Sequence, residues 1–305
     1  MNVREPDWAY VALSLAKVLA VTAALYLAFS ATDRVLWLFV DYDDERTALV
    51  YGTAARVANP DKRLVDGHGD AGWLLNTTYT LKGEPRGAGA SEGWKEYEIV
   101  PSLFGAVRAP SLAGPSGSFS YAISVLEADP EIVPADVRKS IDALPQTLDA
   151  VAVAVVQFVQ PMTSERLIAF NRTHKICGGR DVSYVYAPPW FEYDDSSNDP
   201  PLNAVVWNRD MTEGLIQGEL NYQCEAEPEP ALAEFRKWVG QLDEGDDLSA
   251  FMLDYRWLDR AAGEGLVHGL VVDRWKLADV RKLLDDPEVR TVRLADVAFD
   301  IDGDE

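Results

Sequence analysis

Three residues in the middle of the chain have types and spacings that suit metal or thiol chemistry. His174 and Cys177 lie close together in the sequence, and Cys224 would add a third ligand. Structural zinc takes four protein ligands in a closed tetrahedron, and the sequence offers no evident fourth. A disulfide between the two cysteines would also remove two of the three. The sequence therefore predicts no metal site.

Cys177 and Cys224 are the only cysteines in the chain. In an oxidising compartment an even count favours a disulfide, and closing a loop of this size is worth about 4 kcal/mol in the loop-entropy model. The alternative, two unrelated buried thiols, stays open at the level of sequence. We predict the disulfide.

No catalytic motif stands out. The chain lacks G-x-S-x-G, H-E-x-x-H and a glycine-rich phosphate loop. With 50 acidic residues, carboxylate pairs arise by chance, and a glycosidase needs two at a defined separation. Cys177 as a nucleophile would need a base such as His174 aimed at it, in competition with disulfide formation. The sequence therefore predicts no catalytic residue and no cofactor, and we expect a protein that is not an enzyme.

The segment Tyr184–Tyr193 (YVYAPPWFEY) is dense in aromatic residues. Its two prolines favour an extended turn, and large rigid aromatics on a loop are typical of binding hot spots. The predicted interaction surface consists of Tyr186, Trp190, Phe191 and Tyr193. In the alternative interpretation, Tyr184 and Tyr186 are strand residues and Trp190 packs into the core.

The elements that position these residues follow from the apolar pattern. Residues 149–160 (DAVAVAVVQFVQ) are nearly all apolar and rich in valine, which is typical of a strand buried on both faces. Thr163 then offers an N-cap for a helix over Ser164–Arg172. Further on, the pattern predicts strands over Asp181–Ala187, Gly265–Val272 and Thr291–Phe299, and helices over Glu229–Gln241, Leu248–Ala262 and Lys276–Leu284.

The first part of the chain is richer in strand signals. Aromatic and β-branched residues predict strands over Leu49–Val57, Trp73–Lys82 and Trp94–Val100. Regular periodicity fades over Gly105–Pro134, where proline and glycine cluster. The fold class we predict is α+β, with mixed sheet and helices and a C-terminal part compatible with a ferredoxin-like sandwich. The predicted divisions are a tail (1–7), a transmembrane helix (8–31), a membrane-proximal β-rich region (32–134), a sensor-like domain (135–299) and an acidic tail (300–305).

Residues 8–31 form one long apolar segment. As a helix it would be about 36 Å long, enough to cross a bilayer core with some tilt. Lys17 interrupts it and supports two interpretations. Either the whole segment spans the membrane, with Trp8 and Tyr10 in the interfacial belt, or Val18–Ala31 is the apolar core of a cleaved secretory signal. We favour the retained anchor, and a secreted protein is the alternative.

The charges flanking this segment predict its orientation. Arg4 and the amino terminus precede it, and a cluster of acidic residues follows from Asp41, so the N-terminus is expected inside and the domain outside the cytoplasmic membrane. The first 31 residues carry two basic and two acidic groups, which leaves the net charge of −22 on the rest of the chain. Such a domain is repelled by nucleic acid, so we expect none as a partner, and we expect a protein partner in the membrane or envelope.

Several short patterns occur in the order found in one known family. They are Leu144-Pro145 before the apolar strand, Pro161–Glu165 after it, the strand–helix–strand that starts at Val267–Val272 and closes with Val289–Asp296, and, upstream, Ala58–Pro60 and Tyr97–Gly105. The chain in these places resembles the bacterial sigma-factor regulator family, the extracytoplasmic region of membrane-bound anti-sigma proteins. The resemblance implies a sensory or regulatory domain outside the membrane.

The sequence departs from that family at its amino end. Anti-sigma proteins carry a cytoplasmic segment that grips the sigma factor, whereas only residues 1–7 precede the anchor in this sequence. A segment this short cannot form a useful amphipathic helix. We therefore expect a sensory or binding domain without anti-sigma activity of its own. An envelope-associated enzyme and a structural accessory subunit of a membrane complex are the alternatives.

Overall fold

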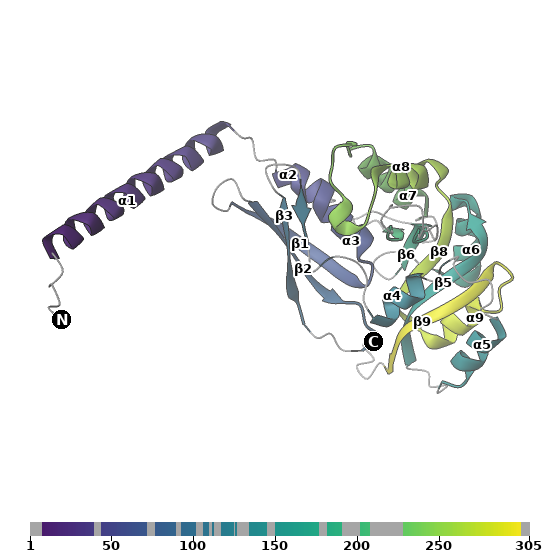
Figure 1. Ribbon diagram of the computed structural model, residues 1–305. Helices are drawn as coiled ribbons and strands as arrows, with labels where there is room; N and C mark the ends of the chain where they lie inside the picture. Colours follow the sequence, from purple (N-terminus) through teal and green to yellow (C-terminus); the bar gives the residue numbers. More distant parts are fainter. Residues whose placement is uncertain are drawn as a thin grey trace, which may run out of the picture.

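The computed structural model contains one projecting helix and a body built on two sheets (Figure 1). It describes residues 8–39, 44–71, 77–89, 93–101, 106–109, 112, 117–124, 126, 134–144, 150–176, 182–190, 202–207 and 228–299. Cys177, Cys224, Phe191 and Tyr193 lie outside the described residues, so the predicted disulfide and half of the predicted aromatic surface stay predictions.

Helix α1 (Trp8–Phe39) confirms the predicted apolar helix and extends beyond it. Its stretch Trp8–Thr32 is long and apolar enough to cross a membrane, and none of it is buried in the protein. Figure 1 shows the helix projecting from the body. The hydroxyls of Thr22 and Thr32 donate to the carbonyls of Val18 and Ala28, at 2.9 and 2.8 Å. These two hydroxyls therefore find partners inside the helix, as an apolar surrounding requires.

The first sheet follows a short helical segment. Its strands run in the order β1-β2-β3-β4, all antiparallel. The elements of this part are α2 (Asp44–Thr47), the π-helical turn η1 (Ala48–Gly52), α3 (Thr53–Ala58), β1 (Lys62–Ala71), β2 (Thr77–Pro85), β3 (Lys95–Pro101) and β4 (Val107–Arg108).

The strand predicted over Leu49–Val57 is wrong, because this segment is helical. Val50, Ala54 and Val57 are all completely buried and recur at a helical spacing. The β-branched residues suggested a strand, but tertiary packing of one helical face decides the local structure here. The strand predicted over Trp94–Val100 is confirmed as β3.

The second sheet has five antiparallel strands in the order β7-β6-β8-β5-β9. The described elements of this part are α4 (Gly117–Ser124), α5 (Pro134–Asp142), β5 (Ala150–Met162), α6 (Ser164–His174), β6 (Val182–Ala187), β7 (Val205–Trp207), α7 (Pro228–Val239), η5 (Ser249–Phe251), α8 (Tyr255–Glu264), β8 (Val267–Lys276), α9 (Leu277–Leu283) and β9 (Val289–Phe299).

Strand β5 lies between β8 and β9 and is buried on both faces, as its valine-rich sequence predicts. One face packs on a core that includes side chains of α6, α7, α8 and α9, and the other packs on α4. The first of these cores also contains Tyr79, Leu81 and Ile99 of the first sheet. A single hydrophobic cluster therefore joins the two sheets.

The starts of two helices, α6 and α8, show which local sequence signals predicted the structure correctly. Thr163 accepts the backbone N–H of Arg166 as the predicted N-cap of α6. The single helix predicted over Leu248–Ala262 is wrong in part, because the turn η5 ends in a left-handed residue, Met252, and α8 begins anew after Asp254. The Asp254 carboxylate accepts two backbone N–H groups of α8, which is a stronger start signal than apolar spacing alone.

Asp247 ties the first sheet to η5 and makes stability depend on pH. Its carboxylate accepts the Ser249 hydroxyl at 2.5 Å, the Ser249 N–H at 3.1 Å and the Val107 N–H of β4 at 3.3 Å. Burial by itself raises the pKa of Asp247, but these hydrogen bonds outweigh it and hold the pKa below its ordinary value.

We expect Asp247→Asn to destabilise the protein at neutral pH. Because the folded-state pKa is depressed, the stabilisation is present above the unfolded-state pKa and is lost as pH falls through the folded-state pKa. The difference between wild type and variant should therefore shrink below about pH 4. Urea unfolding at pH 7, 5, 4 and 3 measures it, with Ser249→Ala as a milder companion that keeps the carboxylate. A difference that is constant with pH contradicts the prediction.

Candidate functional site

The predicted aromatic surface is only partly exposed. Tyr186 is 2% exposed, and its ring stacks on that of Phe235 in α7 at 5.0 Å. Trp190 is half-buried and exchanges two backbone hydrogen bonds with Leu202, at 3.1 and 3.0 Å. The assignment of Tyr186 to a surface is therefore wrong, and the alternative that Tyr184 and Tyr186 are buried strand residues is confirmed.

His174 has a partner other than a metal or a thiol. Its Nε2 lies 2.6 Å from Oδ2 of Asp286, and its ring centroid lies 4.5 Å from that of Phe170. The pair fastens the end of α6 to the turn before β9. Within the described ranges no three His, Cys, Asp or Glu side chains come together as a metal site would need.

A buried group of charges lies where the two sheets meet. Asp273 of β8 has a fully buried side chain, and its Oδ2 accepts Nη2 and Nε of Arg63 from β1 at 2.6 and 2.9 Å. Arg86, whose side chain is 4% exposed, approaches the same oxygen at 3.8 Å, and Glu84 lies 3.4 Å from Arg63. These ion pairs connect β1 of the first sheet to β8 of the second and thereby fix the position of the two sheets relative to each other. We assign them a structural role.

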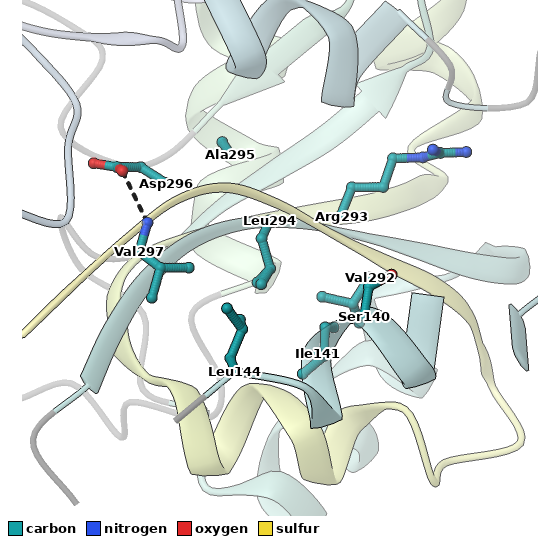
Figure 2. Close-up of a pocket in the computed structure, with 9 residues that line it drawn as sticks. All are labelled: Ser140, Ile141, Leu144, Val292, Arg293, Leu294, Ala295, Asp296 and Val297. Atoms are coloured by element: carbon teal, nitrogen blue, oxygen red, sulfur yellow. Dashed lines mark hydrogen bonds between the residues drawn. The ribbon is translucent and has the colours of Figure 1, made fainter. Parts of the chain in front are cut away.

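An open groove runs along β9 at one end of the second sheet (Figure 2). Its volume is about 610 Å³, and it is lined by Ser140, Ile141 and Leu144 at the end of α5 and by residues 292–297 of β9. Figure 2 shows Leu294 and Val297 pointing into the space toward Leu144. We call it the β9 groove.

Hydrogen bonds hold the α5 wall of this groove. Arg281 of α9 donates from Nη2 to the carbonyl oxygens of Ile141 and Leu144, at 2.7 and 3.1 Å. Arg138 pairs with Asp285 at 2.7 Å and donates to the Leu284 carbonyl at 2.8 Å. The wall is therefore tied to α9 and to the turn that follows it, and the groove is preformed.

A β-bulge shapes the opposite wall. Asp296 pairs with Val153 of β5 and Leu294 pairs with Ala154, so Ala295 is an extra residue between them. Its carbonyl accepts a hydrogen bond from the Ser118 hydroxyl of α4. Bulges commonly occur at sheet edges, where they re-aim side chains.

Because of the bulge, Arg293 and Asp296 lie on the same face of β9. Figure 2 shows both pointing away from the groove. The Arg293 guanidinium carbon lies 6.0 Å from the ring centroid of Tyr121, and Asp296 Oδ2 accepts the Ala88 N–H at 2.9 Å. Strand β9 thus presents apolar side chains to the groove and carries opposite charges on its other face.

None of these groove residues is in the predicted interaction surface. One signal was present in the sequence, since Val137, Ile141 and Leu144 recur at helical spacing and mark an amphipathic helix. The sequence does not show that α5 lies close to β9, because this closeness depends on the order of the strands in the second sheet. Scans of this chain against family models, curated proteins and solved structures return no match.

Proposed function

We propose that this protein is a single-pass, membrane-anchored, extracytoplasmic domain with a sensory or binding role, and that the β9 groove is its binding site. The observation that carries the proposal is the exposed apolar stretch Trp8–Thr32, which makes no use of its apolar surface within the protein. An apolar helix of this length is stable in a bilayer and costly to expose to water.

Charge supports the direction of insertion. Arg4 lies before the stretch and Asp44 and Glu45 lie after it, so the positive-inside tendency favours an external domain. The net charge of −22 also weighs against a nucleic-acid partner. The resemblance to sigma-factor regulators adds a regulatory role to this proposal.

The second sheet supports a ferredoxin-like arrangement as part of the proposal. Four of its strands follow the order β9-β5-β8-β6, with α6 between β5 and β6 and α9 between β8 and β9. Both helices contribute to the same core on one face of the sheet. Two interleaved strand–helix–strand units give this order when all neighbours are antiparallel.

A test of anchoring uses two matched arginine substitutions. Ala20→Arg places a charge at the centre of the stretch, at a cost of about 2.5–3.5 kcal/mol, whereas Ala9→Arg places it at the inner interface, where arginine is favoured. We expect wild type and Ala9→Arg to remain in the membrane pellet after alkaline carbonate, and Ala20→Arg to be partly released. Protease added outside intact cells stripped of their outer layers should digest the wild-type domain.

Two results would refute the anchor. One is a wild-type protein in the soluble fraction with a mature N-terminus near Ala31, which would establish a cleaved signal. The other is a domain that external protease reaches only after the cells are lysed, which would reverse the orientation.

A further inference from the structure

We propose that the partner of β9 and its groove is a second copy of this chain, joined edge to edge by two antiparallel β9 strands about a two-fold axis. This inference rests on the proposed function in one respect: anchoring holds copies in one plane and raises their chance of meeting. An interface of this kind is isologous: the same surface of each copy forms both sides of the contact, so that surface must be complementary to itself.

The outer edge of β9 has no strand partner among the described residues. Among the described strands β9 pairs only with β5, and it occupies one end of the second sheet. Such an edge presents backbone N–H and C=O groups to a further strand. Asp296 and Phe299 are exposed on it, the latter at 54%. A second β9 would cover this edge and extend the sheet.

The bulge divides the edge into two flanks. The Ala295 carbonyl already accepts the Ser118 hydroxyl, so main-chain pairing is not available at the centre. Residues 289–293 lie on one side of the bulge and contain a second register shift, at Arg290, whereas residues 296–299 lie on the other side. In an antiparallel pair the first flank of one copy meets the second flank of the other.

This pairing matches faces as well as flanks. Opposite residues in a β pair must point to the same face, and in a regular strand residues three apart do not. The extra residue of the bulge in β9 brings two residues that are three apart in the sequence onto the same face of the strand. Arg293 and Asp296 share the outer face, while Val292 and Val297 both pack on the core side. Arg293 of one copy can therefore lie opposite Asp296 of the other, with Val292 opposite Val297 beside it.

The charges on β9 are complementary under this two-fold axis. Arg290 and Arg293 lie on the first flank, and Asp296 lies on the second. Two copies with a net charge of −22 repel each other over most of their surfaces, so contact requires a place where local charge reverses that repulsion. The two-fold axis places the flank with the arginines in each copy against the flank with Asp296 in the other copy, so the favourable contact occurs twice in the dimer.

The apolar side of the same edge adds burial. Leu144, Leu294 and Val297 are half-buried and line an open groove. The second β9 strand would close the open side of this groove, removing its apolar surface from water at about 25 cal/mol per Å². The groove, the bulge and the charges therefore favour the same occupant.

The test exploits the two-fold symmetry with one variant of each charge. Arg293→Asp gives a copy with two acidic positions, and Asp296→Arg gives a copy with two basic ones. In detergent, the full-length wild type should be a dimer by sedimentation equilibrium, and each variant alone should show a dimer Kd raised by more than about tenfold. An equimolar mixture of the two variants should restore a mixed dimer, because every aspartate then faces an arginine.

Matched controls carry the same charge changes away from the edge. Asp259→Arg and Arg260→Asp lie on the exposed face of α8 and should leave the dimer Kd within about twofold. Circular dichroism melting confirms that each variant is folded. Arg293→Glu and Asp296→Lys replace any variant that has lost its thermal transition, with the same mixing rule.

Three results overturn the inference: a monomeric wild type, single variants that dimerise as the wild type does, or folded variants that fail to associate when mixed. Persistence of the dimer in both variants would assign association to another surface, α1 included. Dimerisation in detergent needs no bilayer. Release by carbonate with an intact mixed dimer therefore refutes the anchoring proposal alone, and a carbonate-resistant monomer refutes this inference alone.

Discussion

Asp273→Ala is expected to lower the free energy of unfolding by about 3–5 kcal/mol, because it removes one partner of a buried ion pair. The Asp273 carboxylate is fully buried and binds Arg63 through two nitrogens, with Arg86 at 3.8 Å from the same oxygen. Without the carboxylate, the two guanidinium groups remain near each other in a poorly hydrated place. The loss combines desolvation with repulsion between like charges.

Urea unfolding followed by circular dichroism measures this cost. Asp285→Ala is the matched control, because Asp285 is 69% exposed and pairs with Arg138, which is 46% exposed. This exposure limits its effect to about 1 kcal/mol or less. Asp273→Asn separates charge from shape and should fall between the two. A cost for Asp273→Ala no larger than that for Asp285→Ala would show that the joint between the sheets does not depend on this pair.

Trp238→Ala is the second large effect, with an expected cost of about 3–5 kcal/mol. The Trp238 side chain is completely buried, its ring lies 5.5 Å from Trp207 and 6.3 Å from Phe235, and its Nε1 donates to the Leu49 carbonyl at 2.8 Å. The substitution leaves a cavity in the shared core and a carbonyl of η1 without this donor. Both losses act where the first part of the chain meets α7.

A milder variant separates the two losses. Trp238→Phe keeps most of the packing and removes the hydrogen bond, at an expected cost of about 1 kcal/mol plus a smaller cavity. Trp94→Ala is the control, since Trp94 is 59% exposed and its loss should stay within about 0.5 kcal/mol. Thermal unfolding ranks the three. Equal melting temperatures for Trp238→Ala and Trp94→Ala would contradict the assigned core position.

The elements that could be predicted from the sequence are those whose local pattern and tertiary role agree. The valine-rich run of β5 is buried on both faces, and the cap at Thr163 starts α6 where expected. The helix over α7 was also expected, because Leu232, Phe235 and Trp238 fall on one face. The mixed α and β character followed from these elements.

The remaining features depend on contacts between distant segments. Leu49–Val57 has strand-forming residue types but packs as a helix against Trp238 and the first sheet. The β9 groove joins α5 to a strand that follows it by about half the length of the chain. Its bulge is a register shift against β5, and a register shift leaves no signature in one strand alone. The predicted interaction surface failed at Tyr186 for a related reason, since aromatic residues suit cores and hot spots equally.

The contacts of α2 and η1 determine how a pull on α1 would be transmitted to the rest of the protein. Only residues 40–43 separate α1 from α2. Arg46 of α2 is held by Asp243 and Asp246 at 2.8 and 2.9 Å, and the next attachment is the bond from Trp238 to Leu49. A pull on α1 therefore reaches the turn after α7 through Arg46 before it reaches η1, which contacts both α7 and the first sheet. The Arg46 ion pairs, of which the one with Asp246 is partly buried, are the first contacts in this path. The contact of Trp238 with Leu49 follows.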